Sequence, residues 1–238
     1  VATAQLFLDK DPLLFSQLSE RLRNQTVLAQ SAVDENLFMF EHVGSQLKSD
    51  IDFVEGVLEI NGTYLRFVSD DLKADREVAT IAMRQTYKAF GYVADSLKED
   101  VDWVATILDD YSMEVTNYAI RLEEEGWGIQ KIPEVFRYSK ELCEIGLANR
   151  GQSLQHAPNV IRQDAQLVEI AVSQNGLALE FADDKLQSDT RIVEAALSQN
   201  GRATKFVSPL LLADERYRKR IVRKYPSAQG ILREMGYE

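Results

Sequence analysis

The chain repeats its own sequence with a period of 25 residues. Residues 164–188 read DAQLVEIAVSQNGLALEFADDKLQS and residues 189–213 read DTRIVEAALSQNGRATKFVSPLLLA, so that Asp aligns with Asp and Gln-Asn-Gly with Gln-Asn-Gly. Self-similarity at a fixed spacing is typical of proteins built by stacking one small structural module. The sequence therefore constrains architecture strongly, whereas it predicts no reaction.

Each repeat has the pattern of a short helical hairpin. Counting the Asp as position 1, positions 4, 5, 8 and 9 are apolar, which places them on one stripe of an α-helix. The Asp is a good N-cap, and we expect the glycine of Asn-Gly at positions 12 and 13 to end the helix in the left-handed conformation. A second apolar set at positions 16, 18, 19 and 23 predicts a short second helix. A hairpin of this size cannot bury its own stripe and must stack on its neighbours.

The consensus D-x-x-φ-V-x-x-A-φ-x-Q-N-G-x-A-x-x-F, clearest over Asp164–Asp214, resembles the tandem repeat called domain of unknown function 4116. The resemblance implies an all-α protein that carries several copies of the repeat. Members of that family often occur in proteins of intracellular bacteria and protists, so the resemblance also implies a part of a larger, host-directed protein. No activity is established for the repeat, and the resemblance therefore transfers no catalytic residue.

The same register extends over most of the chain. Repeats are predicted to begin at Gln25, Asp50, Asp75, Asp100, Ser139, Asp164, Asp189 and Asp214. We predict an all-α solenoid of about eight or nine stacked ~25-residue helical-hairpin repeats. Its parts are an acidic N-terminal repeat block (1–124), an insertion (125–138), a C-terminal repeat block (139–213) and a C-terminal cap (214–238), all in one continuous solenoid. The register also places Val1 at position 2 of a repeat, which predicts further repeats upstream.

Three stretches depart from the repeat. Thr86-Tyr87 and Tyr111-Ser112 stand where other repeats have Asn-Gly, so we expect longer helices in those two repeats. The insertion EGWGIQKIPEVFRY has Pro133 at a predicted helix start, and it either bends the solenoid or forms a protruding loop. Within it, Trp127 between two glycines is either an exposed partner-binding anchor or a plug for the gap that the insertion opens.

Composition and charge exclude several classes of protein. The 45% hydrophobic and 27% charged residues are ordinary for a folded protein, and no apolar run reaches the ~18–20 residues of a membrane span. One cysteine excludes an intrachain disulfide and favours a reducing, cytoplasmic compartment, which for a secreted effector would be the host cytosol. Residues 1–125 hold 24 acidic and 11 basic residues, a net charge of −13, and this argues against nucleic acid as a partner.

Two charged clusters are candidate binding surfaces. Acidic side chains on the exposed face of the predicted helices would form a row that is either a solvated face or a surface for a basic protein: Asp34, Glu35, Glu55, Glu59, Asp109 and Asp110. Basic side chains crowd the last repeat and either solvate the cap or bind phosphate, lipid headgroups or an acidic protein: Arg216, Arg218, Lys219, Arg220, Arg223 and Lys224.

The residues that suggest catalysis or metal binding all have structural explanations. His42 and His156 occupy position 18, an aromatic position in other repeats, and no further ligand stands at metal spacing. Cys143 and His156 belong to one repeat at positions expected to face the core, so a thiol-dependent enzyme is the alternative function. The Asp residues that begin the repeats are predicted caps and not metal ligands. No cofactor motif is present.

The sequence thus predicts a non-enzymatic protein–protein interaction scaffold without cofactor or metal. Thiol-dependent catalysis at Cys143 and His156, and anion binding by the basic C-terminal helix, are the alternatives. Extended repeats favour the first interpretation because they offer long surfaces on which many modest contacts add up.

Overall fold

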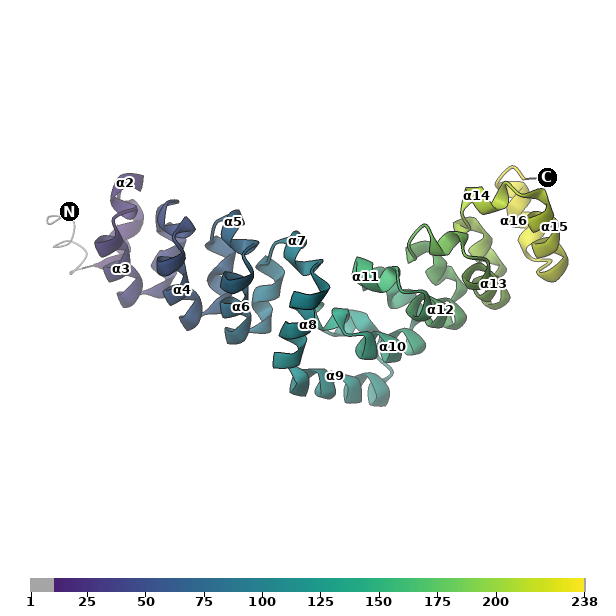
Figure 1. The fold of residues 1–238 in the computed structure, drawn as a ribbon, viewed down its shortest axis with the longest axis horizontal. Helices are drawn as coiled ribbons and strands as arrows, with labels where there is room; N and C mark the ends of the chain where they lie inside the picture. The colour runs from purple at the N-terminus through teal and green to yellow at the C-terminus, as the bar shows by residue number, and fades with distance from the viewer. Residues whose placement is uncertain (1–10, 238) are drawn as a thin grey trace. The chain divides into compact units, whose positions relative to one another are not determined.

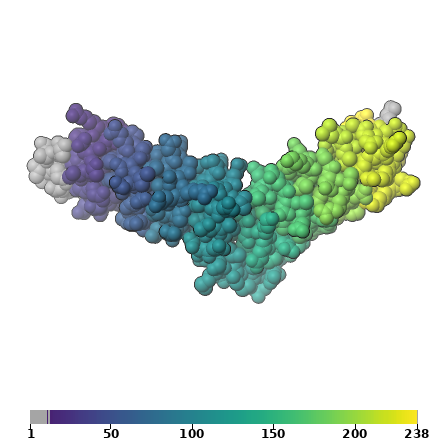
Figure 2. All heavy atoms as spheres, viewed as in Figure 1, coloured from purple at the N-terminus to yellow at the C-terminus, as the bar shows by residue number. Residues whose placement is uncertain are grey.

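The structure, a computed structural model, describes residues 11–237, and within that range all regular secondary structure is helical (Figure 1). The chain divides into two compact units between Asp110 and Tyr111, here called unit 1 and unit 2. This division lies inside the predicted N-terminal block of residues 1–124. The predicted register of Val1 falls outside the described residues. The side chains of neighbouring segments form a continuous surface within each unit (Figure 2).

The helices of unit 1 follow one another in short segments, where α marks an α-helix and η a 3₁₀ helix. They are η1 (Pro12–Gln17), α2 (Glu20–Arg23), α3 (Thr26–Glu35), η2 (Leu37–His42), η3 (Leu47–Ser49), α4 (Ile51–Ile60), η4 (Gly62–Phe67), α5 (Asp70–Lys73), α6 (Arg76–Gln85), η5 (Tyr87–Tyr92), α7 (Asp95–Lys98) and α8 (Val101–Asp110).

Unit 2 begins with α9, the longest helix among the described residues. It then returns to the alternation of α-helices and short 3₁₀ helices that is found in unit 1. Its elements are α9 (Ser112–Glu125), η6 (Ile129–Lys131), η7 (Glu134–Tyr138), α10 (Lys140–Asn149), η8 (Gly151–His156), α11 (Asn159–Arg162), α12 (Ala165–Gln174), η9 (Gly176–Phe181), η10 (Leu186–Ser188), α13 (Thr190–Gln199), η11 (Gly201–Phe206), α14 (Pro209–Leu212), α15 (Glu215–Lys224) and α16 (Ala228–Glu234).

A typical repeat therefore contains three helical segments. The repeat that begins at Asp50 has a 10-residue α-helix (α4), a 6-residue 3₁₀ helix (η4) and a 4-residue α-helix (α5). The sequence predicted the first helix and a shorter second one. The second is a 3₁₀ helix of six residues, in agreement with the general occurrence of 3₁₀ helices as short segments.

The predicted apolar stripe is the core of each repeat. Positions 4, 5, 8 and 9 are all buried in six of the ten-residue helices, for example as Phe53, Val54, Val57 and Leu58 in α4. From the 3₁₀ helix, positions 15 and 16 are buried as well, as Tyr64 and Leu65 in the same repeat. The stripe of α4 is covered by neighbouring segments, since α4 contacts η3, η4 and α6.

Side-chain caps begin the two main segments of a repeat. A carboxylate accepts from backbone N–H groups at the start of an α-helix at all six predicted positions: Asp50, Asp75, Asp100, Asp164, Asp189 and Asp214. The 3₁₀ helix is capped in the same way by the side chain at position 12, namely Asn36, Asn61, Thr86, Asn175 and Asn200. The capping function predicted for the aspartates is confirmed, and the asparagines share it.

The predicted reason for the glycine after Asn is wrong. Within residues 11–237 positive φ is found only at Gly126 and Gly236, so Gly62 and Gly176 are not in the left-handed conformation. A Cβ atom at either position would overlap the backbone carbonyl oxygen of the next repeat, that of Ala82 or Ala196. Glycine is required because two repeats approach each other here, which is the other common use of this residue.

The glutamine of the Gln-Asn-Gly motif also connects repeats. Gln174 Oε1 accepts from the Gly151 N–H at 2.7 Å, and Gln199 Oε1 accepts from the Gly176 N–H at 2.6 Å. Each of these buried N–H groups therefore has a partner in the following repeat, and burying it without one would be costly. The motif is thus an inter-repeat contact as well as a turn.

Consecutive repeats also share one recurring backbone hydrogen bond. In unit 1, the Ser69 N–H donates to the Lys48 carbonyl at 3.0 Å and the Ala94 N–H to the Lys73 carbonyl at 3.1 Å. In unit 2 the equivalent bond joins Ser208 to Gln187 at 3.0 Å. The main helices of successive repeats contact each other in chain order, α4 with α6 in unit 1, and α10 with α12 and α12 with α13 in unit 2 (Figure 1).

The irregular stretches behave in different ways. Thr86 caps a 3₁₀ helix as Asn does, so the longer helix predicted for that repeat is absent. After Tyr111 the chain does form the long helix α9, as predicted. The insertion is not a protruding loop, because it forms η6 and η7 and contributes four fully buried side chains to unit 2: Ile129, Ile132, Val135 and Phe136.

Candidate functional site

The acidic candidates lie at the surface of unit 1. Asp34, Glu35, Glu59, Asp109 and Asp110 are exposed at the ends of their helices, and Glu55 is half-buried in α4. One of them has a polar neighbour within its own helix, since Gln30 Nε2 donates to Asp34 at 2.7 Å.

The predicted acidic row is interrupted. Helix α6 contacts both α4 and α8, and at position 10 it carries Arg84 where the neighbouring helices carry Glu59 and Asp109. Glu59 and Asp109 are therefore not brought side by side, and the acidic surface is two patches with a basic residue between them.

Trp127 stands in a stretch of backbone held by the end of α10. Asn149 Nδ2 donates to the Trp127 carbonyl at 3.1 Å and to the Leu122 carbonyl at 2.7 Å, while Arg150 Nε donates to the Gly126 carbonyl at 3.1 Å. The Trp127 residue itself is half-buried. It is thus accessible in part, on a backbone that is fixed by several hydrogen bonds.

Several of the basic candidates on α15 are engaged within the protein. Arg220 and Lys224 form ion pairs with Glu194 of the preceding repeat at 3.0 Å and 2.6 Å, and Lys219 pairs with Glu215 at 2.5 Å. The hydrogen bond from Lys224 to Glu194 raises the pKa of this lysine. Arg218 Nη1 donates to the carbonyls of Leu212 and Ala213, at 2.7 Å and 3.1 Å.

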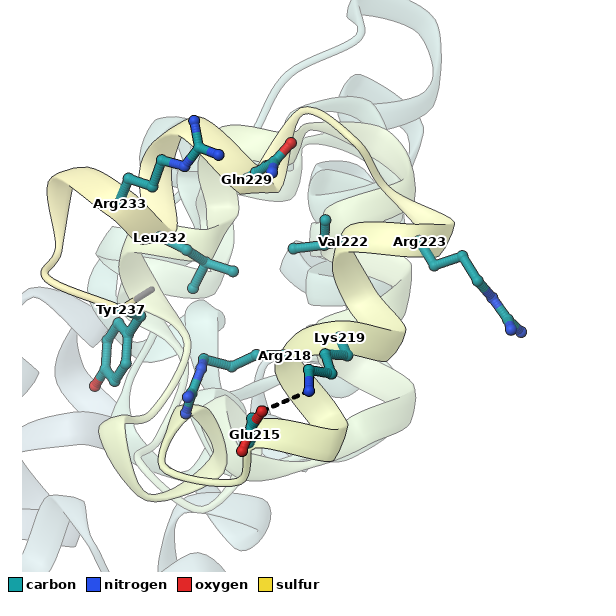
Figure 3. Close-up of a pocket in the computed structure, with 9 residues that line it drawn as sticks. All are labelled: Glu215, Arg218, Lys219, Val222, Arg223, Gln229, Leu232, Arg233 and Tyr237. Carbon is teal, nitrogen blue, oxygen red and sulfur yellow. Dashed lines mark ion pairs between the residues drawn. The ribbon is translucent and has the colours of Figure 1, made fainter.

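Three exposed arginines of the last repeat make no ion pair with any described residue. They are Arg216 and Arg223 on α15 and Arg233 on α16. Arg233 was not among the binding residues predicted from the sequence. Side chains of α15, α16 and the following turn line a groove of about 340 Å³: Glu215, Arg218, Lys219, Val222, Arg223, Gln229, Leu232, Arg233 and Tyr237 (Figure 3). Only Arg218, Lys219 and Arg223 among these were predicted.

The thiol candidate is placed unfavourably for catalysis. Cys143 is fully buried, its Sγ donates to the Arg137 carbonyl at 3.1 Å, and burial raises the pKa of the thiol to about 12. His156 is exposed at the end of η8, so the expectation that both side chains face the core is wrong. Position 18 lies at the rim of the repeat, since Phe67, Phe181 and Phe206 are only half-buried there.

Two of the aspartates that begin the repeats form ion pairs across repeat boundaries. Lys140 Nζ lies 2.7 Å from Asp164, and Arg76 pairs with Asp100. Partial burial raises the pKa of Asp164, but hydrogen bonds from Lys140 and from the first turn of α12 outweigh it and leave the pKa below its ordinary value. Among residues 11–237 no three His, Cys, Asp or Glu side chains are grouped to bind a metal ion.

The fold defines an all-helical protein with an internal repeat. A family model described as Domain of unknown function (DUF4116) matches the chain twice, over residues 50–98 and 164–212. One match lies in each compact unit, and each spans two consecutive repeats from a capping aspartate onwards. The comparisons with curated proteins and with solved structures gave no match. Within residues 11–237 no helix has the length and apolar character needed to cross a membrane.

Proposed function

We propose that this chain is a non-enzymatic scaffold for protein–protein interaction, built as one solenoid of stacked ~25-residue repeats. The observation that carries the proposal is the recurring contact between repeats in both units, made by equivalent backbone hydrogen bonds and equivalent buried positions. Such contacts hold surface side chains of successive repeats in a fixed register, which suits recognition of an extended partner.

The surface that fits a partner best is the acidic part of unit 1. Asp34, Glu35 and Glu59 are exposed on α3 and α4 and have no basic side chain paired with them among the described residues. A partner segment rich in Lys or Arg would meet complementary charge there, which favours its rate of association and its specificity.

The environment of Cys143 supports a binding function over thiol chemistry. A thiol needs to be ionised to act as a nucleophile, and a pKa of about 12 keeps Cys143 protonated at neutral pH. By the family resemblance, we further propose that the scaffold belongs to a larger host-directed protein of an intracellular bacterium and acts in a cytosolic compartment.

Proximity labelling in cells tests the proposal. The wild-type chain is compared with Asp34→Lys/Glu59→Lys, which reverses two charges in the acidic patch on α3 and α4, and with Arg84→Glu, which changes charge on the neighbouring helix α6. We expect the double variant to lose a reproducible set of labelled proteins that Arg84→Glu keeps. Retention of the whole set in the double variant, with its circular dichroism spectrum unchanged, would exclude the acidic surface as the binding site.

A second variant tests the insertion. Trp127→Ala leaves the hydrogen bonds of the Trp127 backbone in place, because Asn149 bonds to a carbonyl group. If the half-buried indole contacts a partner, labelling of that partner falls while the thermal unfolding temperature stays close to that of the wild type. A large drop in unfolding temperature with unchanged labelling would show that Trp127 only fills space.

A further inference from the structure

The groove between α15 and α16 corresponds to a helix-binding position of the earlier repeats. In unit 2, α12 contacts both α10 and η8 of the repeat before it, and α13 contacts both α12 and η9. Each main helix therefore packs against the α-helix and the 3₁₀ helix of the preceding repeat. In the last repeat α16 stands in place of the 3₁₀ helix and contacts η11. No described element occupies the groove that α15 and α16 form.

The charge at this groove is reversed relative to the earlier repeats. Position 6 is Glu144, Glu169 and Glu194 in the preceding repeats of unit 2 and Lys219 in α15. Two of these glutamates form ion pairs with basic side chains of the following repeat. Glu169 pairs with Arg191 at 3.0 Å, and Glu194 pairs with Arg220 at 3.0 Å and with Lys224 at 2.6 Å. A further repeat of the same kind would bring basic side chains against Lys219, so charge complementarity requires a different occupant.

The lining of the groove shows what that occupant needs. Val222 and Leu232 are turned toward the space between the two helices, whereas Arg223 extends outward from α15 and Arg233 extends from α16 (Figure 3). Arg223 and Arg233 make no ion pair with any described residue. An apolar floor with unpaired cations at its edges fits a helix that has an apolar stripe bordered by carboxylates.

We propose that the groove between α15 and α16 binds an acidic amphipathic α-helix of a partner protein. The apolar stripe of that helix packs on Val222 and Leu232, and its Asp or Glu side chains pair with Arg223 and Arg233. Arg218 is committed to the carbonyls of Leu212 and Ala213 and acts as a structural residue. This surface is separate from the acidic surface of the proposed function, so each can fail without the other.

A displayed library of helical peptides tests the proposal. The probe is a set of ~20-residue peptides with apolar residues at i, i+3, i+4 and i+7 and random residues elsewhere. We expect the wild-type protein to enrich peptides with Asp or Glu beside the apolar stripe. Affinity for an enriched peptide should fall at least about tenfold in Arg223→Glu/Arg233→Glu, and the loss should shrink at high salt.

The matched control is Arg216→Glu. Arg216 is exposed on the same helix but does not line the groove, so this variant makes the same Arg-to-Glu reversal at one position outside the groove and should bind within about twofold of the wild type. Circular dichroism of all variants confirms that they fold. Enrichment of neutral or basic peptides, no enrichment, or equal affinity in the double variant overturns the proposal.

Two further measurements identify a different occupant. Binding of inorganic phosphate or of vesicles with anionic lipid that the double variant loses, together with no peptide enrichment, would assign the groove to an anion or a membrane. Concentration-dependent self-association in sedimentation that the double variant loses would assign it to a second copy of this chain. Either result overturns a partner helix as the occupant.

Discussion

The turn at Thr86-Tyr87 in unit 1 and the turn at Arg150-Gly151 in unit 2 stand at the same position of their repeats and reach the same structure by different means. Thr86 caps η5 with its side chain, and no glycine follows it. Arg150 provides no side-chain cap, but Gly151 allows close approach to Ala171 of the next repeat and donates its N–H to Gln174. Both turns begin a six-residue 3₁₀ helix.

The comparison shows that either a side-chain cap or a glycine contact suffices to begin the 3₁₀ helix. Repeats with Asn-Gly have both. The turn at Tyr111-Ser112 has neither, and there the chain continues into the 14-residue helix α9. Among these three turns, the 3₁₀ helix therefore forms where a cap or a glycine contact is present, and the long α-helix forms where both are absent.

The largest expected effect comes from filling the space at the glycine contact. A Cβ at Gly151 would overlap the carbonyl oxygen of Ala171, and backbone cannot move aside as a flexible side chain does. We expect Gly151→Ala to destabilise the protein by an amount near the upper end of roughly 1–3 kcal/mol, measured by urea unfolding.

The control substitution, Gly56→Ala, is expected to change the free energy of unfolding in the opposite direction. Gly56 lies exposed inside α4 with open space around its missing Cβ, so Gly56→Ala should stabilise by about 0.5–1 kcal/mol through helix propensity. Equal effects of the two substitutions would show that contact between repeats does not explain the glycine.

Removing the glutamine acceptor should have the next largest effect. Gln174→Ala leaves the buried Gly151 N–H without its partner at 2.7 Å, which costs about 1–3 kcal/mol. Gln85→Ala is the matched control, because Gln85 has the same position in unit 1 and makes no side-chain hydrogen bond among the described residues. A cost at Gln85 equal to that at Gln174 would argue that the residue acts through helix propensity.

These contacts mark the limit of what the sequence could predict. The buried stripe, the capping aspartates and the all-helical fold follow from periodicity and local chemistry, which each repeat carries within itself. The closeness of Gly151 to Ala171 depends on how two repeats pack, which no single repeat encodes. For the glycine in Asn-Gly, the left-handed conformation is a sufficient local explanation, and it was wrong here. For the same reason the sequence selected Arg223 but not Arg233, since α16 departs from the repeat pattern and only the packed structure brings the two together.

Removing the cap at Thr86 should have a smaller effect. Thr86 Oγ1 accepts from the Lys88 N–H at 3.3 Å, and Thr86→Ala is expected to cost about 1 kcal/mol, whereas Thr86→Ser should restore most of it. Asn175→Ala removes the same cap from a turn that keeps Gly176 and its bond to Gln199. Hydrogen exchange at the first turn of η5 and η9 should therefore accelerate more in Thr86→Ala, and the reverse order would contradict the comparison.

The smallest expected effect concerns charge at the start of a repeat and depends on pH. Because hydrogen bonds from Lys140 and α12 leave the pKa of Asp164 below its ordinary value of 3.8, its charge contributes stability above that pH, and the contribution is lost as the pH falls through the folded-state pKa. Asp164→Asn keeps a good cap but cannot ionise, so its stability should fall less than that of the wild type between about pH 5 and pH 3. Asp189→Asn is the control, since Asp189 caps α13 without a bonded lysine or arginine among the described residues. Parallel pH profiles for the wild type and Asp164→Asn would show that Asp164 stabilises its repeat as a cap alone, as Thr86 does in unit 1.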